Sequence, residues 1–344
     1  MQFFRTPNFA AVLSFPNCKI NLGLRIHRRR TDGYHGIESV FYPVPWCDAL
    51  EIIPSEKFSF EHAAAATFSH AEPSHSHAES SHSHAEFISA SGIKGTGSRN
   101  KFGMTVHGIP KQVRHDSDKG VLVDSFADQN LCVKAYYLLQ KEFHLKPVNI
   151  FLLKKIPLGS GLGGGSSDAW FTLQMLNELF ELRLEEKKLF HYAALLGSDV
   201  PFFQKNIPML VTGRGEEHDK INLDLSRYHI TIVVPDVQVS TKWAYETFDS
   251  FRLRGKLEKK NHTATVDEII QMPVKKWKQL LTNDFEEVVF KKFPLLKEIK
   301  DKLYASGAVY ASMSGSGSAV YGIFKTPPEK LSFRQSFTVF NSPL

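Results

Sequence analysis

The sequence predicts a protein built from both helices and strands, with enough residues for two domains. The chain has 344 residues, of which 42% are hydrophobic and 23% charged, a composition typical of a globular protein with a sizeable core. Stretches with the period of a strand are interspersed with stretches that have the period of a helix. In residues 154–170, "KKIPLGSGLGGGSSDAW", a predicted strand leads through a glycine-rich loop into a predicted helix. This order of elements predicts a site that binds phosphate groups.

The first predicted strand covers residues 12–24, "VLSFPNCKINLGL". After the proline its apolar side chains fall on one face, and the other face carries Lys19, Asn21 and Gly23. The following "RRRTDGYHGIESVFYPV" has an Asp-Gly turn before an apolar run, which predicts a hairpin. The basic residues 25–30 are interpreted as its solvated tip, since no aromatic residues interleave them as in an RNA-binding surface.

Residues from about 61 to 115 have a different composition. The segment repeats SHAE and SHSHAE and shows no sustained period of 2 or 3.6. Such low-complexity sequence buries too little apolar surface to offset its ordering entropy, so we expect a disordered insertion. The alternative is a tract that chelates Zn²⁺ or Ni²⁺ through its clustered histidines.

The remaining elements follow from periodicity and from helix start and stop signals. We expect helices over residues 128–143, from 168, over 185–197 and over 293–307, and strands over 148–157, 229–241, 308–312 and 319–325. A second glycine-serine loop, "MSGSGS", separates the last two strands.

Charge and cysteine content restrict the class of protein. A net charge of +6 and a pI near 9.0 suit anionic partners such as phosphorylated metabolites. Three cysteines without a CxxC pair fit a reducing compartment. No convincing signal peptide and no run approaching ~18 apolar residues is found. The expectation is a cytoplasmic protein without a membrane partner.

The glycine loop matches the common phosphate-binding motifs only in part. Its glycines allow backbone N–H groups to point inward, and Ser166, Ser167 and Asp168 are candidates to cap the helix or, through the serine hydroxyls, to reach a phosphate oxygen or a metal-bound water. The GxGxxG pattern of dinucleotide-binding proteins is present, but the acidic residue about twenty positions on is Glu181, at the end of a helix. No lysine follows the glycines as in Walker A, and no HRD or DFG of protein kinases occurs.

Three segments in order resemble the motifs of the GHMP small-molecule kinases: "PNCKINLGL", "PLGSGLGGGSSDA" and "SMSGSGSAVYGIF". Further stretches, "KINLGLRIHRRRTDGYH", "LGSDVPFF" and "TNDFEE", are similar to the branch that phosphorylates the 2-hydroxyl of 4-diphosphocytidyl-2-C-methyl-D-erythritol in the non-mevalonate route to isoprenoids. The resemblance covers roughly residues 15–54 and 118–325. It implies a two-domain α+β fold, with an ATP-binding domain of the ribosomal protein S5 domain 2 type over 1–215 and a C-terminal domain over 216–344.

The resemblance also implies the catalytic residues. The family's catalytic aspartate falls on Asp199, which would accept the proton of the substrate hydroxyl, and its partner lysine falls on Lys19. Without the resemblance, an aspartate after a helix stop is more often a turn cap, and a lysine on a strand is more often a surface residue.

The remaining implied roles concern binding. For a substrate with a cytidine diphosphate moiety they fall on Tyr34 and His35 of the DGYH turn, on Tyr245 with Trp243 as a rival stacking residue, and on Asn21, Thr241 and Gly315. The loop residues implied to bind ATP are Pro157, Leu158, Gly159, Ser160, Gly161, Leu162, Gly163, Gly164, Gly165, Ser166 and Ser167, together with Asn130. Mg²⁺ is expected as a companion of ATP, but no pair of carboxylates marks its ligands. No nucleic-acid partner is expected, and the chain is either a monomer or a homodimer.

Rival functions remain open from the sequence. A GHMP kinase for homoserine or mevalonate is the nearest, although such substrates offer no base to the DGYH turn. An NAD-binding oxidoreductase and a catalytically silent nucleotide-binding protein are the others. Retention of both Lys19 and Asp199 argues against the silent protein.

Overall fold

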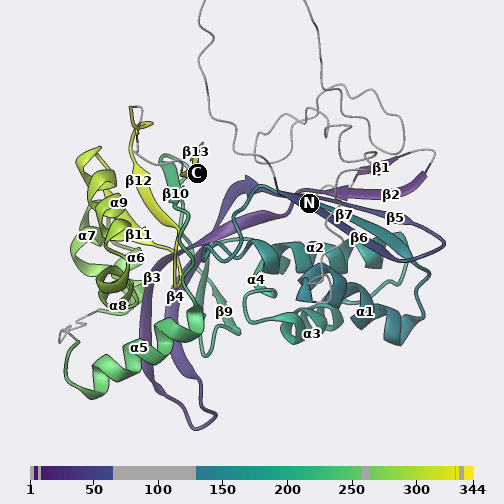
Figure 1. Ribbon diagram of the computed structural model, residues 1–344, viewed down its shortest axis with the longest axis horizontal. Helices are drawn as coiled ribbons and strands as arrows, with labels where there is room; N and C mark the ends of the chain where they lie inside the picture. Colours follow the sequence, from purple (N-terminus) through teal and green to yellow (C-terminus); the bar gives the residue numbers. More distant parts are fainter. Residues whose placement is uncertain (1–3, 7–8, 65–128, 258–263, 330, 333–336) are drawn as a thin grey trace, which may run out of the picture. The chain divides into compact units, whose positions relative to one another are not determined.

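The computed structural model describes residues 4–6, 9–64, 129–257, 264–329, 331–332 and 337–344 (Figure 1). The contacts between residues group the chain into two compact units that interleave along the sequence. The first unit comprises the described parts of Met1–Pro16, Asp48–Lys155 and Phe171–Glu185. The second comprises those of Asn17–Cys47, Ile156–Trp170 and Glu186–Leu344. The predicted domain boundary after residue 215 remains a prediction. The two units are each made of several segments, so they do not test a division of the chain at a single residue.

The first unit contains a five-stranded sheet. Its order is β1-β2-β5-β7-β6, and only the pair β6 and β7 is parallel. Helix α1 lies along one face of this sheet (Figure 1), and the Asn130 side chain caps the helix by accepting a hydrogen bond from the Cys132 N–H. The elements are β1 (Phe4–Thr6), β2 (Phe9–Ser14), β5 (Ala49–Pro54), β6 (Ser59–Ala64), α1 (Leu131–Phe143), β7 (Val148–Lys154) and the second half of α2 (Gly164–Leu179).

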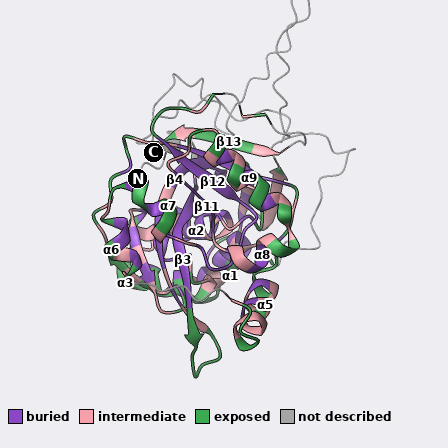
Figure 2. Ribbon diagram, turned by 90° about the vertical axis from the view of Figure 1, so that its left-hand side faces the viewer, coloured by how far each residue is buried: buried purple, intermediate pink, exposed green. Residues whose placement is uncertain are grey.

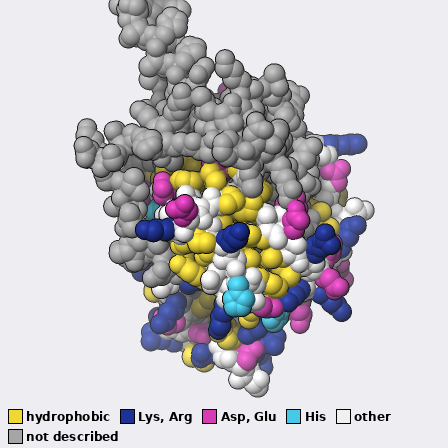
Figure 3. Space-filling view, turned by 90° about the vertical axis from the view of Figure 1, so that its right-hand side faces the viewer, with side chains coloured by type: hydrophobic (Ala, Val, Ile, Leu, Met, Phe, Trp, Pro, Cys, Tyr) yellow, Lys and Arg dark blue, Asp and Glu magenta, His cyan; other side chains and the backbone are white. Residues whose placement is uncertain are grey.

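An aromatic group of the first unit is only partly buried. The Phe58 and Tyr136 rings stack with their centroids 4.5 Å apart, and Tyr137, which is 48% exposed, packs against both. Figure 3 shows hydrophobic side chains gathered among charged ones on one face of the molecule. The three family-like motifs lie in the second unit, apart from Pro16 at the start of the first motif.

The second unit contains two four-stranded antiparallel sheets, ordered β3-β4-β8-β9 and β11-β12-β10-β13. The strands are β3 (Asn17–Arg29), β4 (His35–Cys47), β8 (Met209–Thr212), β9 (Glu217–Lys220), β10 (His229–Val234), β11 (Tyr310–Met313), β12 (Val320–Phe324) and β13 (Thr338–Pro343). The helices are α3 (Glu186–Leu196), α4 (Phe202–Lys205), α5 (Thr241–Leu253), α6 (Val266–Ile270), the 3₁₀ turn η3 (Val274–Lys276), α7 (Trp277–Leu280), α8 (Glu286–Lys292) and α9 (Pro294–Ala305).

One hydrophobic core joins the two sheets of the second unit. Alternate residues of β3, such as Ile20 and Leu22, belong to the same buried cluster as Ile232 of β10 and Tyr321 of β12. The hairpin of β3 and β4 is buried along most of its length and exposed at its tip (Figure 2). The predicted hairpin is therefore confirmed, and its long strands carry residues from the core out to the solvent.

Three expectations need correction. Residues 61–64, placed in the disordered insertion, form the end of β6 and pair with β7, because their register continues a five-stranded sheet. The rest of that insertion up to residue 115 lies outside the described residues. The predicted strand 12–24 is two strands, interrupted at Phe15 and Pro16. The helix expected from Asp168 begins at Gly164, so Ser166 and Ser167 lie in its first turn, Asp168 follows that turn, and none of the three is at the N-cap position.

The other predicted helices agree with α1, α3 and α9, and the predicted strands with β7, β10, β11 and β12, within a few residues except at the C-terminal end of 229–241, which enters α5. Within the described residues no helix is long and apolar enough to cross a membrane.

Candidate active site

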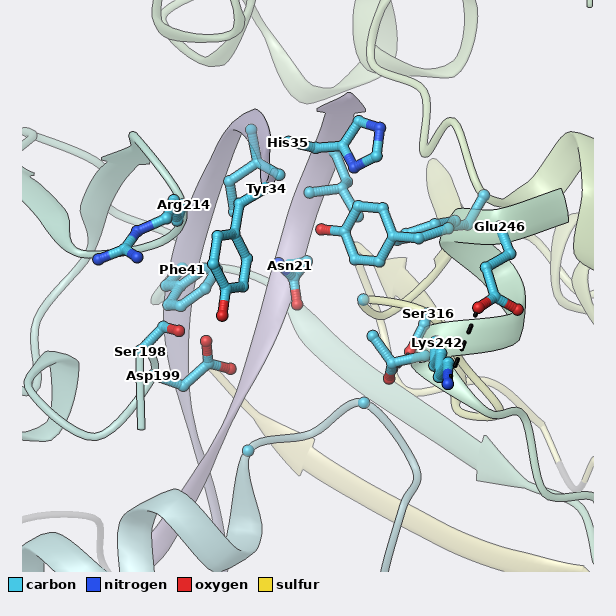
Figure 4. Close-up of a pocket in the computed structure, with 18 of the residues that line it drawn as sticks. Asn21, Tyr34, His35, Phe41, Ser198, Asp199, Arg214, Lys242, Glu246 and Ser316 are labelled. Atoms are coloured by element: carbon cyan, nitrogen blue, oxygen red, sulfur yellow. Dashed lines mark hydrogen bonds and ion pairs between the residues drawn. The ribbon is translucent and has the colours of Figure 1, made fainter. Parts of the chain in front are cut away.

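A cavity of about 560 Å³ lies entirely within the second unit (Figure 4). Its wall includes both candidates for phosphoryl transfer, Lys19 and Asp199. The six candidates for substrate binding also line it: Asn21, Tyr34, His35, Thr241, Tyr245 and Gly315. Of the glycine loop, Gly161 and Gly163 reach the cavity. Residues from distant parts of the sequence therefore surround one space.

Lys19 and Asp199 form an ion pair in the wall of this cavity. Lys19 is held by β3, and Asp199 lies in the turn that follows α3, where the Val200 N–H donates to the Gly197 carbonyl. The Lys19 Nζ is 3.3 Å from Asp199 Oδ2, and the side chains are 4% and 35% exposed. The lysine is thus buried behind a carboxylate that stays open to the cavity.

Further contacts fix the lysine ammonium, including a hydrogen bond that it donates to the Gly161 carbonyl at 3.5 Å. It donates to Asn21 Oδ1 at 2.6 Å, and it lies 4.2 Å from the centroid of the Phe41 ring. Asn21 in turn donates from Nδ2 to Ser39 Oγ at 3.0 Å. A buried ammonium needs such partners, because leaving it unpaired in a low-dielectric site costs several kcal/mol. The interpretation of Lys19 as a surface lysine is wrong, since only 3% of the residue is exposed.

The glycine loop packs directly on β3. The Lys19 N–H donates to the Leu162 carbonyl at 2.9 Å, so the strand and the loop share a backbone hydrogen bond. Gly163 has φ +70°, and a Cβ there would come within 3.0 Å of Lys19 Cε. Gly161 has φ +81°, and a Cβ there would overlap the Ser314 carbonyl oxygen. Both positions require glycine for its conformation and for its lack of a side chain.

The three motifs meet at Ser314. Its hydroxyl donates to the Gly161 carbonyl at 2.9 Å and accepts from the Asn21 N–H at 3.2 Å. A second link joins the same loops, because the Ala319 N–H donates to the Ser160 carbonyl at 2.9 Å. One hydroxyl therefore connects the first, second and third motifs within hydrogen-bond distance of each other.

The remaining loop residues lie around the start of α2. Among the described residues, Ser167 Oγ is buried and has no hydrogen-bond partner. Such an orphaned hydroxyl at the N-terminal turn of a helix suits a phosphate oxygen or a Mg²⁺ ligand, and Mg²⁺ needs few protein ligands because it keeps waters and phosphate oxygens. No cluster of three or more His, Cys, Asp or Glu side chains that could hold a metal occurs in the described part of the chain. The residues present fit a Mg²⁺ ion carried in with a nucleotide.

Aromatic side chains form another part of the cavity wall. Tyr34, in the turn between β3 and β4, is 59% exposed, and the Arg214 guanidinium lies 5.1 Å from its ring centroid (Figure 4). The His35 ring stacks on Tyr245 at 5.1 Å and 15°, and Tyr245 packs its edge against Phe285 at 4.8 Å. This wall offers flat, polarisable faces of the kind on which a base stacks.

Of the two rival stacking residues, Tyr245 lines the cavity. Trp243 is not part of its wall and packs against Phe293, with the Lys292 Nζ 4.1 Å above its ring. Burial, and to a smaller degree the charge of Asp199, raises the pKa of Tyr245 to about 12. The Tyr245 side chain therefore stays a neutral phenol over the whole working range of pH.

Two other predicted residues are placed as follows. Thr241 begins α5, and its Oγ1 lies 2.7 Å from Ser316 Oγ in the third motif. Asn130 belongs to the first unit, where its side chain caps α1. Its predicted role toward ATP remains a prediction.

Several residues of the wall were not predicted. Arg214 comes from the turn between β8 and β9, Asp249 from α5, and Arg29 from the basic tip of the hairpin. Asp249 had a readable signal, because it follows Tyr245 by four residues and so lies on the same face of the helix. Arg214 and Arg29 had none, since only the fold brings their turns to the cavity.

Comparison with known proteins places the chain in a family. The family model of the GHMP kinases N terminal domain matches residues 130–205. The family model of the GHMP kinases C terminal domain matches residues 266–337. The 4-diphosphocytidyl-2-C-methyl-D-erythritol kinase of Bacteroides fragilis strain YCH46 is 40% identical over 320 residues, which covers 93% of this chain and 94% of that protein.

The chain belongs to the 4-diphosphocytidyl-2-C-methyl-D-erythritol kinase family. The relative from Bacteroides thetaiotaomicron is 42% identical over 318 residues, covering 91% of this chain and 92% of its own. A crystal structure of a 4-(cytidine 5'-diphospho)-2C-methyl-D-erythritol kinase aligns with a TM-score of 0.62 and 25% identity, over 90% of this chain and 89% of that one.

Kinases outside the 4-diphosphocytidyl-2-C-methyl-D-erythritol kinase family share the fold. Methanococcus jannaschii mevalonate kinase aligns with a TM-score of 0.58 but only 14% identity, over 92% of each chain. The expected two-domain GHMP kinase fold and the expected family are thus confirmed, and the NAD-binding alternative is set aside. The chain is a small-molecule kinase of a family that uses ATP.

Proposed function

We propose that this chain transfers the γ-phosphoryl group of ATP to the 2-hydroxyl of 4-diphosphocytidyl-2-C-methyl-D-erythritol, with Asp199 as the general base and Lys19 as its partner. The observation that supports the roles most directly is the 3.3 Å ion pair in a cavity where three family motifs meet. This activity is the one that the family name of its relatives describes.

Asp199 suits the task of proton acceptor. Its carboxylate is 35% exposed and lines the cavity, so a substrate hydroxyl is able to approach it. As the hydroxyl oxygen attacks the γ-phosphorus, its proton passes to Asp199, and the bond to the bridging oxygen of ADP breaks. General-base assistance of this kind typically contributes ~10²–10⁴-fold to the rate.

Lys19 suits the stabilisation of charge. Its ammonium is held between Asp199, Asn21 Oδ1 and the Phe41 ring, and it is ion-paired with the proposed base. A fixed positive charge in a buried site stabilises the negative charge that develops on the transferred group, without reorganisation during the reaction. Lys19 also orients the Asp199 carboxylate before the substrate arrives.

The glycine loop, residues 157–167, is proposed to bind the ATP phosphates. Its left-handed glycines shape the backbone, and the start of α2 presents N–H groups and a positive dipole end. Ser167, whose hydroxyl is buried and unpartnered among the described residues, is the candidate to hold Mg²⁺. When bound, the ion would neutralise charge on the phosphates.

The aromatic wall is proposed to bind the cytosine. Tyr34 offers an exposed ring, Tyr245 lines the cavity with one face stacked on His35, and His35 offers a ring nitrogen. Thr241, Gly315 and Asn21 are proposed to orient the methylerythritol end, since they line the same cavity on the side of Lys19 and the third motif.

The test is an ATP-consumption assay with three candidate substrates, each added separately. We expect turnover with 4-diphosphocytidyl-2-C-methyl-D-erythritol and none with homoserine or mevalonate. With the first substrate, Asp199→Asn should turn over about 10²–10⁴-fold more slowly than the wild type. Binding of NAD is measured in parallel. Turnover with homoserine or mevalonate alone would overturn the proposal.

A further inference from the structure

His35 is held by two side chains of one helix. Its ring stacks on Tyr245, and its Nε2 lies 2.8 Å from Asp249 Oδ1, with only 7% of the histidine side chain exposed. Tyr245 and Asp249 are one helical turn apart on α5 and so share a face. The ring therefore has a fixed plane and a fixed rotation within that plane.

Helix α5 is itself tied to the hairpin that carries His35. The Arg252 guanidinium donates to the backbone carbonyls of His27 at 2.8 Å and of Ile26 at 2.5 Å. These two carbonyls belong to β3, the partner strand of β4. The bond between His35 and Asp249 thus joins elements that are already docked, so little entropy is lost in keeping it.

The chemistry of this contact determines which histidine nitrogen carries the proton. An ionised carboxylate only accepts hydrogen bonds, so Nε2 must be the protonated nitrogen. In the neutral ring Nδ1 is then left as an acceptor. Cytosine has an exocyclic amino group that donates to such an acceptor, whereas uracil has a carbonyl oxygen at the same position.

We propose that Asp249 is a positioning residue that fixes the Nε2-protonated tautomer of His35, and that this tautomer makes the cavity prefer a base with an exocyclic amino group over uracil. The preference for the base rests on the proposed function, in which His35 contacts the cytosine. The tautomer is a property of the ligand-free protein and is measured without any substrate.

The first experiment reads the tautomer by nitrogen-15 NMR of the histidine side chains in the full-length protein. The His35 signals are assigned as those missing from His35→Gln. We expect a protonated Nε2 and an unprotonated Nδ1 in the wild type, and a mixture of tautomers in Asp249→Ala. Protonation of both nitrogens, of Nδ1 alone, or an unchanged spectrum in Asp249→Ala would overturn the inference.

The second experiment compares substrates with cytosine and uracil bases in Asp249→Ala, Asp249→Asn and Asp301→Ala. We expect Asp249→Ala to raise the KM for the cytidine substrate about 3- to 10-fold, the value of one hydrogen bond, and to lower the preference for cytosine by a similar factor. The kcat and the KM for ATP should change less than about 2-fold, because Asp249 is not part of the phosphoryl-transfer group. Asp249→Asn keeps a carbonyl oxygen that accepts from Nε2, so it should retain most of the preference.

Asp301→Ala is the matched control. Asp301 also lies on a helix of the second unit and is ion-paired, with Lys297 four residues earlier, but it is 60% exposed and is not part of the cavity wall. It should leave both KM values unchanged. Equal losses in the Ala and Asn variants of Asp249 would overturn positioning through the hydrogen bond. Absence of turnover by the wild-type chain, with the expected tautomer present, would instead overturn the proposed function.

Discussion

The cavity has two ends that differ in how firmly their side chains are held. At the transfer end, which we define as Lys19, Asn21 and Asp199, the lysine is 3% exposed and its ammonium contacts a carboxylate, an amide and an aromatic ring. At the nucleoside end, defined as Tyr34, His35 and Tyr245, the first tyrosine is 59% exposed. The same β3–β4 hairpin contributes to both ends, with the buried first residues of β3 at one and its exposed tip at the other.

The difference follows from what each end has to do. Phosphoryl transfer depends on atoms placed to within a fraction of an ångström, which requires buried and mutually bonded groups. A base that must enter and leave tolerates an aromatic ring on an exposed turn, because stacking depends on contact area more than on one bond length. We therefore expect changes at the transfer end to act on kcat and changes at the nucleoside end to act on KM.

The largest effect should come from the ion pair itself. Asp199→Asn keeps the shape and removes the proton acceptor, so kcat should fall by about 10²–10⁴-fold. The KM for ATP should hardly change, because the proposed phosphate site is the separate loop 157–167. Single-turnover phosphoryl-transfer rates, with melting temperatures measured alongside, check this. A rate near that of the wild type, or a large fall in melting temperature, would contradict the assignment.

Variants of Lys19, alone and combined with Asp199→Asn, test whether the two residues act as one unit. Lys19→Ala should lower kcat by a similar factor, and the double variant should lose much less than the product of the two, because residues that act as one unit are not additive. Lys19→Arg should restore little, since a planar guanidinium does not replace a compact ammonium. Multiplicative losses would show two independent structural residues.

The next effect concerns the junction of the motifs. In Gly161→Ala the new methyl group would overlap the Ser314 carbonyl oxygen and the residue would have to keep φ +81°. We expect kcat to fall about 10²-fold, since a displacement of about 1 Å at the reacting groups is enough for that. The steady-state rate and the thermal stability are measured together.

Gly307→Ala separates the effect of a left-handed φ from the effect of a steric overlap. Gly307 has φ +95° at the end of α9, but a Cβ there meets nothing within 4 Å. It should lose only the roughly 1–2 kcal/mol of a left-handed non-glycine residue, with kcat unchanged. If Gly161→Ala behaves in the same way, the loop does not depend on this close approach.

A smaller effect, confined to one substrate, is expected at the nucleoside end. Tyr34→Ala should raise the KM for the cytidine substrate about 5- to 150-fold, which corresponds to about 1–3 kcal/mol of base stacking, and leave the KM for ATP unchanged. Tyr34→Phe keeps the ring and should stay close to the wild type. Equal weakening of both substrates would mean that the variant is misfolded and that the two ends are not separable.

The same contrast governs how far the sequence alone predicts this protein. The three motifs, the lysine on the polar face of β3 and the hairpin were readable because each depends on residues close in sequence. The meeting of Gly161, Ser314 and Asn21 was not, since it depends on how strands far apart in the chain pair and pack. Asn283 is an example of what the sequence does not predict. Its "TNDFEE" stretch supports a family resemblance but gives the asparagine no structural role.

In the structure the role of Asn283 is physical. Its Nδ2 donates to the carbonyls of Met313 at 2.8 Å and of Gly315 at 2.7 Å, on either side of Ser314. The residue is 1% exposed, so these two hydrogen bonds hold the third motif in place from the protein interior. Periodicity treats such an asparagine as one more polar residue, because nothing nearby in the sequence marks the two carbonyls that it satisfies.

The smallest expected effect tests the packing behind the transfer end. His218 of β9 lies 6.5 Å from the Phe41 ring and bonds the Gly215 carbonyl at 2.9 Å. Burial lowers the pKa of His218 below its usual 6.5, outweighing this hydrogen bond and the negative charge of Asp199, both of which raise it. The folded chain therefore binds fewer protons at this histidine than the unfolded chain. The resulting stability is fully present above pH 6.5 and is lost as the pH falls through the folded pKa.

Melting temperatures of the wild type and of His218→Gln, measured from pH 8 to pH 5, should diverge in their pH dependence, with the wild type losing more on acidification. Parallel curves would mean that His218 is not desolvated behind Phe41 and that the transfer end is more open than its buried lysine indicates.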